Sequence, residues 1–287
     1  MIKNRRAFIT GIKSTSLTIS EKKFLKKYKP WGVIIFSRNI KSFEQLKKLI
    51  NDIKKIFNDI NYPILIDEEG GRVNRLKKLF DTSVFTGSFF FNIYKKDIKK
   101  FYLYYRIFSK QISYILKSLG ININTVPVLD VRRKNSNNVI GDRSFGFDPK
   151  IVSEIGDFCI DEFTKNKIGT IIKHIPGHGL AKVDSHKKTP IVKEKIHLLN
   201  KKDFYPFKNK KCFFAMTAHI IYQDIDASNT ATHSKKVIKL IRNKIKFKNL
   251  IISDDISMKA LKLSITQNTI KAFNAGCNLV LHCNGRL

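Results

Sequence analysis

The chain has 287 residues, of which 43% are hydrophobic, and this apolar fraction excludes an intrinsically disordered protein because it is enough to build a large core. Lysine and arginine number 55 against 23 aspartates and glutamates, which gives a formal net charge of +32 at pH 7. Since the lysines are scattered along the whole chain, we interpret the charge as a solvated surface or as steering of an anionic substrate, and we expect no specific nucleic-acid partner.

The sequence indicates neither membrane insertion nor secretion. No apolar run approaches the roughly 20 residues that cross a bilayer. Polar residues between Gly11 and Ser16 interrupt the basic N-terminus before the core of a signal peptide can form. The four cysteines include no C-x-x-C pair and are typical of reduced thiols. We therefore expect a cytoplasmic protein without a membrane partner.

Short apolar runs rich in Ile, Val and Phe recur along the chain and alternate with helical patterns. The intervals between the runs are too long for hairpins, so we expect βα units and a parallel sheet. The predicted strands cover residues 7–12, 32–37, 63–68, 123–130, 169–175, 213–219, 250–255 and 279–284.

The clearest helices are predicted over residues 42–59, 97–119 and 148–166. In the first, Ser42 and Gln45 form a capping-box pattern and apolar residues recur on one face. Gly120 follows the second where a helix end favours a left-handed residue. Pro149 suits the first position of the third.

Eight strands that alternate with helices predict an α/β fold, a (β/α)8 barrel of the TIM type that forms a single domain over residues 1–287. No linker rich in Pro, Gly or Ser divides the chain, and no repeat of solenoid period is present. The sequence stops at Leu287, directly after the eighth run, so we expect the outer helix that would cover the last strand to be missing.

The catalytic face of such a barrel lies at the carboxyl ends of its strands, where the βα loops converge. Polar residues follow the predicted strands at these ends. They are Ser37-Arg38-Asn39, Asp67 to Arg72, Asp130, Lys173-His174, Thr217-Ala218-His219 and Ser253-Asp254-Asp255. Polar residues end many strands, but charged pairs directly after several apolar runs favour one shared site.

The loop KHIPGHGLAKVDSHKKTP, residues 173–190, is rich in histidine and also contains an aspartate, and both residue types bind zinc. Pro176 and Gly177 prevent the helix that would put His174 and His178 on one face, so we expect no metal.

Asp184-Ser185-His186 in the same loop favours acid-base chemistry instead. A carboxylate that binds one ring nitrogen fixes the tautomer and leaves the other nitrogen to transfer protons near neutral pH. The alternative is a loop histidine that is merely satisfied by its neighbour.

Two adjacent acids, Asp254 and Asp255, end the run LIIS. Because neighbouring residues of a strand point to opposite sides, we expect one of them to face the barrel mouth and the other to face away. A carboxylate near Arg75, Arg143 and Lys173 would stay ionised, as an attacking group must. The spacing does not decide which of the two faces the site.

A set of motifs extends this site along the chain. They are DEEGGRVNRL (67–76), PVLDV (127–131), VIGDRSFGFDP (139–149), KHIPGHG with VDSH (173–186), MTAHIIY (216–222), SDDISMKAL (253–261) and NAGCNLVLHCN (274–284). In this order they resemble the β-N-acetylhexosaminidases of glycoside hydrolase family 3, and among these the single-domain cytoplasmic bacterial enzymes of peptidoglycan recycling.

The resemblance implies a retaining, two-step hydrolysis of β-linked N-acetylglucosamine from cell-wall fragments that carry 1,6-anhydro-N-acetylmuramic acid, without a cofactor. It implies that Asp254 is the nucleophile, that His186 is the general acid/base and that Asp184 is the partner of His186. The sugar-binding positions that carry over are Asp67, Arg75, Arg143, Lys173 and His174.

Two features depart from the family pattern. Glu68 stands where the family usually has glutamine, which adds a negative charge near the sugar site. Family chains also continue well beyond the equivalent of Leu287. The alternative interpretations are a barrel that binds sugar without turning it over, and a family 3 β-glucosidase, against which the Asp-Ser-His segment argues.

Overall fold

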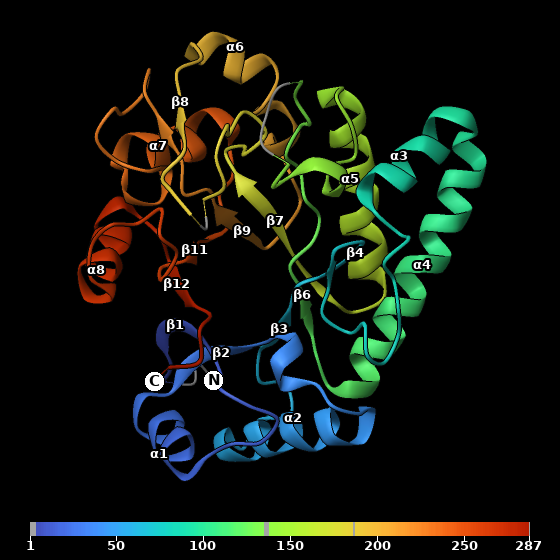
Figure 1. Cartoon of the computed structure of the whole chain (residues 1–287), viewed down its shortest axis with the longest axis vertical. Helices are drawn as coiled ribbons and strands as arrows, with labels where there is room; N and C mark the ends of the chain where they lie inside the picture. Colours follow the sequence, from blue (N-terminus) through green and yellow to red (C-terminus); the bar gives the residue numbers. More distant parts are fainter. Residues whose placement is uncertain (1–3, 135–137, 186, 287) are drawn as a thin grey trace.

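The computed structural model describes residues 4–134, 138–185 and 187–286, which form a closed barrel of eight parallel strands. The strands follow one another around the barrel in chain order, and the last pairs with the first (Figure 1). They are β1 (Arg6–Gly11), β2 (Pro30–Ile35), β3 (Ile64–Ile66), β6 (Ile123–Asn124), β7 (Gly169–Ile175), β9 (Phe214–Thr217), β11 (Leu250–Asp255) and β12 (Leu279–His282). The predicted (β/α)8 barrel is therefore confirmed.

Some strands are shorter than the apolar runs that predicted them. Strand β3 begins after Pro63, and β6 ends before Pro127. Proline has no N–H group to donate to a neighbouring strand, so it limits regular pairing.

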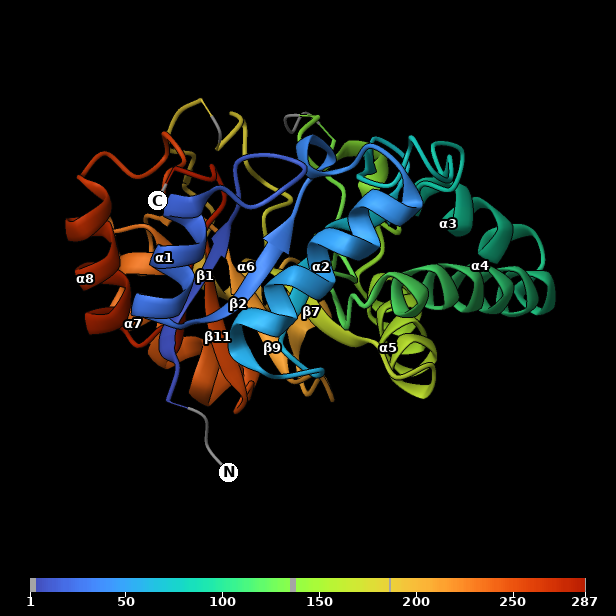
Figure 2. The same ribbon diagram turned by 90° about the horizontal axis from the view of Figure 1, so that it is seen from below.

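The helices pack around the outside of the barrel, and Figure 2 shows α1, α2, α5 and α8 surrounding the strands. The helices of the described residues are α1 (Ile19–Tyr28), α2 (Phe43–Phe57), α3 (Gly87–Lys96), α4 (Ile98–Leu119), α5 (Pro149–Lys165), α6 (Ile196–Lys201), α7 (Lys235–Leu240) and α8 (Ile265–Ala275). None of them is long and apolar enough to cross a bilayer.

Helices α2, α4 and α5 confirm the three predicted helices. The Ser42 side chain caps α2 by accepting from the Gln45 N–H, but the Gln45 side chain accepts from the Lys41 N–H, so the full capping box does not form. Gly120 ends α4 with φ +88°, as its position predicts.

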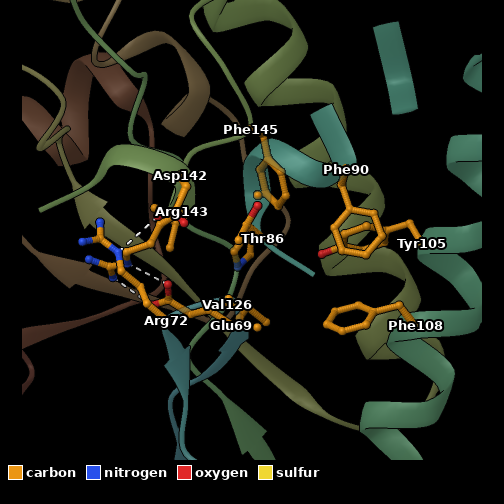
Figure 3. A pocket seen from close by; sticks show the side chains of 15 residues that line it. Glu69, Arg72, Thr86, Phe90, Tyr105, Phe108, Val126, Asp142, Arg143 and Phe145 are labelled. Carbon is orange, nitrogen blue, oxygen red and sulfur yellow. Dashed lines mark hydrogen bonds and ion pairs between the residues drawn. The ribbon is translucent and has the colours of Figure 1, made fainter. Parts of the chain in front are cut away.

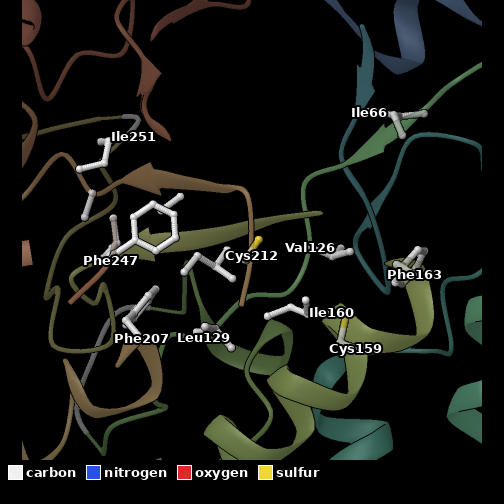
Figure 4. Packing of buried hydrophobic residues seen from close by; sticks show 14 of the residues in the cluster. Ile66, Val126, Leu129, Cys159, Ile160, Phe163, Phe207, Cys212, Phe247 and Ile251 are labelled. Carbon is white, nitrogen blue, oxygen red and sulfur yellow. The ribbon is translucent and has the colours of Figure 1, made fainter. Parts of the chain in front are cut away.

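Two apolar clusters stabilise the barrel. One takes residues from all eight strands, among them Ile9, Ile34 and Ile252, and therefore lies inside the barrel. The other fills the layer between strands and helices. Figure 4 shows part of it, where Cys159, Ile160 and Phe163 of α5 face the barrel wall. Most residues of the strands are thus buried, as in other parallel barrels, although β1 begins with two exposed residues.

Within the described residues no helix follows β12, but the strand is largely buried and Val280 is only 3% exposed. An apolar groove of about 540 Å³ lies there between α1 and α8. Phe8 and Val280 of the barrel wall, Phe24 of α1, and Ile265 and Phe273 of α8 line it.

The loops at the carboxyl ends of the strands contain two small sheets. The antiparallel pair β4 (Glu68–Gly70) and β5 (Val73–Asn74) follows β3, and the parallel pair β8 (Ile191–Val192) and β10 (Ile221–Tyr222) joins the loops after β7 and β9. Gly70 in the first pair has φ +84°, and a Cβ there would lie 2.3 Å from the carbonyl oxygen of Phe85, so only glycine fits.

Candidate active site

A cavity of about 200 Å³ opens at the carboxyl ends of the barrel strands. Its walls come from the end of β7, the last residues of β11 and the segments that follow β2, β3 and β12. The lining residues are Phe36, Asp67, Glu69, Val73, Arg75, Arg143, Lys173, His174, Met216, Asp254, Asp255, Met258, Leu281 and Cys283.

The cavity brings together most of the predicted site residues. Those that line it are Asp67, Arg75, Arg143, Lys173, His174 and Asp254. Asp184 is described but is not among the lining residues. His186 lies outside the described residues, so its predicted pairing with Asp184 stays a prediction.

Glu69 of β4 is the centre of a buried ionic cluster on one wall of the cavity. Its carboxylate accepts from Arg143 Nε at 2.7 Å and Arg143 Nη2 at 2.8 Å, and Lys173 Nζ lies 2.6 Å from it. The Lys173 side chain is only 3% exposed. Burial by itself would raise the pKa of Glu69, but the charges of Arg143 and Lys173 reverse this and lower it to about 2.

Asp67, directly after β3, completes this wall. Its carboxylate accepts from Arg75 Nη2 at 3.0 Å and from the hydroxyl of Thr125, and it lies 3.4 Å from Lys173 Nζ. Burial would raise its pKa, but Lys173 and Arg75 hold the pKa well below its usual range. Both Asp67 and Glu69 are therefore carboxylates at neutral pH.

A second, very small cavity of about 20 Å³ lies behind the cluster. Figure 3 shows Glu69 and Arg143 pointing toward each other, with Phe90 and Tyr105 on the opposite side. The aromatic side chains thus form the wall of this cavity that lies opposite the ion pair.

Asp130 is a fully buried carboxylate that orients His174, another residue that lines the cavity. It accepts from the His178 N–H at 2.6 Å and pairs with Nδ1 of His174 at 2.7 Å. Burial would raise its pKa, but the His174 imidazole and its hydrogen bonds keep the pKa below the ordinary value. Since Asp130 occupies Nδ1, Nε2 is the ring nitrogen of His174 that can meet a ligand.

Asp254 and Asp255 both line the cavity, so the expectation that one would face away was wrong. The reason is a register shift between Ile252 and Asp255 in the pairing of β11 with β12, which breaks the strict alternation.

The protein engages the Asp255 carboxylate itself. Asp255 accepts from the Ser257 N–H at 3.0 Å, from the Ser257 hydroxyl at 2.8 Å and from the Cys283 N–H at 3.2 Å. These bonds give Asp255 a structural part, and the Asp254 carboxylate in turn accepts from the Asp255 N–H at 2.8 Å.

The loop after β7 docks against the segment after β11. The carbonyl of Ser185 accepts from the Ala260 N–H at 3.1 Å, and the Thr189 hydroxyl donates to the Ala260 carbonyl at 2.7 Å. The Asp184 carbonyl accepts from the Lys187 and Lys188 N–H groups. Ser185 and Thr189 therefore lie against the segment that follows Asp254 and β11.

Glu68 points away from the cavity and is 1% exposed. Its carboxylate accepts from the Leu76 N–H and from the Thr82 hydroxyl, each at 2.9 Å. Burial outweighs these bonds and raises the pKa of Glu68 to about 7. The negative charge predicted near the sugar site is thus buried behind it.

We expect Glu68→Gln to stabilise the protein above pH 7. Between pH 4.5 and about 7, Glu68 is protonated in the folded state but ionised in the unfolded state. The free energy of unfolding therefore falls as the pH rises through that window. Glutamine removes the effect, and Thr82 can accept from its amide. Urea unfolding should show a gain of roughly 2 kcal/mol at pH 8.5 and almost none at pH 5. An equal gain at both values would contradict this explanation.

The sequence placed Glu69 and Asp130 among the polar residues at the strand ends but assigned neither of them a role in the site. Both lie in motifs that it singled out, and Asp130 is the polar end of a predicted strand. Their hydrogen-bond partners are 74 and 44 positions away, so local spacing carried no signal of these contacts.

Comparison with known proteins is consistent with this site. The model of the glycosyl hydrolase family 3 N-terminal domain matches residues 10–287. A beta-hexosaminidase of Nitrosomonas eutropha is 34% identical over 284 residues, which cover 95% of this chain and 79% of that protein. A beta-hexosaminidase of Idiomarina loihiensis is 32% identical over 96% of this chain and 83% of its own length.

Solved structures show the same similarity in three dimensions. NagZ from Neisseria gonorrhoeae, in complex with N-trifluoroacetyl-D-glucosamine, superposes with a TM-score of 0.87 at 29% identity, over 98% of this chain and 82% of that one. A family 3 beta-N-acetylglucosaminidase from Paenibacillus gives 0.84 at 25% identity, over 96% of this chain and 53% of that one.

Proposed function

The chain belongs to glycosyl hydrolase family 3 and is a glycoside hydrolase of the β-hexosaminidase type, and from this premise we propose its substrate and its mechanism. The substrate is a peptidoglycan fragment, N-acetylglucosamine β-linked to 1,6-anhydro-N-acetylmuramic acid, with or without attached peptide. The reaction retains the β configuration, needs no cofactor and takes place in the cytoplasm. The free cysteines, Cys159, Cys212, Cys277 and Cys283, support that location.

The observation that carries the proposal is that Asp254 shares one small cavity with a set of groups suited to sugar hydroxyls. Asp67 is an ionised acceptor, Lys173 is a buried donor, and His174 can present Nε2. Arg75 and Arg143 border the same space and add positive charge for an anionic fragment.

In the first step the Asp254 carboxylate attacks the anomeric carbon, and the bond from this carbon to the leaving oxygen breaks. His186, as an imidazolium, gives its proton to that oxygen. In the second step neutral His186 takes a proton from water, which attacks the same carbon and releases Asp254. A histidine suits both steps because its ordinary pKa is near neutrality, and Asp184 is its proposed partner.

Replacement of His186 by alanine should lower kcat/KM on the disaccharide by about 10² to 10⁴-fold, because proton transfer to a poor leaving group is lost. With an activated aryl N-acetyl-β-glucosaminide, azide should restore turnover and give the β-glycosyl azide, since azide needs no general base. The measurement is product analysis by NMR.

His197→Ala is the matched control, because His197 is an exposed histidine of α6. It should leave the rate unchanged. Folded wild-type protein that cleaves neither the aryl glycoside nor the disaccharide would refute the proposal, and faster cleavage of the corresponding β-glucoside would reassign the substrate.

A further inference from the structure

The loop after β7 is held by a chain of hydrogen bonds that begins inside the barrel mouth. Asp130 accepts from the His178 N–H at 2.6 Å while it also holds the His174 ring. His178 Nε2 then lies 3.2 Å from the Ser185 hydroxyl oxygen. The exposed fraction is 2% for His178 and 3% for Ser185, so water does not compete for this contact.

The protonation state of His178 follows from its surroundings. Burial and the nearby His174 lower the pKa of His178 to about 4, so the ring is neutral at pH 7. Nδ1 is buried and has no hydrogen-bond partner within the described part of the chain. A buried N–H group without a partner is costly, so we assign the hydrogen to Nε2, which donates it to Ser185.

Ser185 is also fixed from its other side. Its carbonyl accepts from the Ala260 N–H at 3.1 Å, and Ala260 belongs to the segment that follows Asp254 at the end of β11. Ser185 thus connects the β7 loop to the strand end of the proposed nucleophile, and its sequence neighbours are Asp184 and His186.

We propose that His178 and Ser185 are positioning residues: their hydrogen bond fixes Ser185 against the segment that follows Asp254, so that proton donation by the next residue in the chain, His186, and nucleophilic attack reach the same glycosidic bond. This inference rests on the proposed roles of His186 and Asp254. Asp130 orients both the sugar-facing His174 and the start of the loop, so it couples substrate binding to this arrangement.

The test uses two substrates that differ in their need for a proton. Phenyl N-acetyl-β-glucosaminide has a basic leaving group, whereas the 3,4-dinitrophenyl glycoside departs without protonation. Ser185→Ala should lower kcat/KM for the phenyl glycoside roughly tenfold or more and for the dinitrophenyl glycoside less than about threefold. A purely structural role would lower both rates equally.

Three further variants guard against misfolding. His178→Gln keeps an N–H donor near Nε2 and should retain more of the phenyl-glycoside rate than His178→Leu, while both keep the backbone N–H that donates to Asp130. Ser113→Ala is the matched control, since Ser113 is a buried serine of α4 whose hydroxyl has no partner among the described residues. It should behave as wild type.

The outcomes separate this inference from the proposed function. Equal losses on both substrates, or no loss on either, with an active wild type would overturn the positioning role and leave the hydrolase intact. A wild type that cleaves neither substrate would overturn the proposed function and the positioning role with it. Selective loss on the phenyl glycoside, with rescue in His178→Gln, would support the positioning role.

Discussion

Replacement of Asp254 by asparagine should lower kcat/KM for N-acetyl-β-glucosaminides by about 10⁴-fold or more, because the proposed covalent step loses its proposed nucleophile. Asparagine has the same shape but carries no charge, so substrate binding and folding should change little. The measurement is the hydrolysis rate of a 4-methylumbelliferyl N-acetyl-β-glucosaminide, together with thermal unfolding.

The neighbouring Asp255→Asn is a matched control for this prediction. The Asp255 carboxylate accepts from Ser257 and Cys283, and an amide satisfies fewer of these donors. We expect about 1 to 3 kcal/mol lower stability and most of the activity. The opposite ranking of the two variants would assign the nucleophile to Asp255.

Covalent labelling gives an independent check on the nucleophile. A 5-fluoro analogue of N-acetylglucosaminyl fluoride should accumulate as an ester, because the ring fluorine slows both steps while the fluoride leaving group keeps the first step fast. Peptide mapping by mass spectrometry should place the added mass on Asp254. A label on any other carboxylate would contradict the proposed mechanism.

Replacement of Lys173 by methionine should lower the free energy of unfolding by about 3 to 5 kcal/mol, because it leaves buried carboxylates without part of their positive partner charge. Lys173 Nζ lies 2.6 Å from Glu69 and 3.4 Å from Asp67. Methionine preserves the length of the side chain, so packing changes little. Urea unfolding at pH 7 measures the effect.

The pH dependence identifies the cause of this loss. The folded pKa of Glu69 is lowered to about 2 from an ordinary 4.5, so its stabilising contribution is complete above pH 4.5 and disappears as the pH falls toward 2. The difference in unfolding free energy between Lys173→Met and wild type should therefore become smaller as the pH falls from 5 to 2. A constant gap would point to lost packing instead.

Lys210→Met provides the matched control for the buried lysine. Lys210 Nζ is also buried and lies 2.6 Å from a carboxylate, but its partner Asp157 is 55% exposed and can be hydrated when the lysine is lost. We expect a smaller loss, about 1 to 2 kcal/mol. It should also leave hydrolysis unchanged, because it does not line the cavity.

The sequence predicted the barrel because the signal for it is local. Each run such as 169–175 is apolar on both faces, which is typical of a strand that is buried on both sides, and the structure confirms it as β7. Helix ends were equally predictable where one residue decides them, as at Gly120. The small sheets β4-β5 and β8-β10 were not predicted, because strands of two or three residues carry no periodicity.

The candidate site, like the fold, was predicted in part from the sequence and in part determined only by the tertiary structure. The chain alone specified which acids and bases stand at the strand ends, including Asp67, Lys173 and Asp254, and closure of the barrel brings these ends to one cavity. Only the tertiary structure decided which of these groups form ion pairs with one another. Glu69, for example, pairs with Arg143, which is 74 positions away in the sequence. Such a pairing depends on distances in the folded barrel and on the exclusion of water, and neither quantity is encoded in the spacing of residues along the chain.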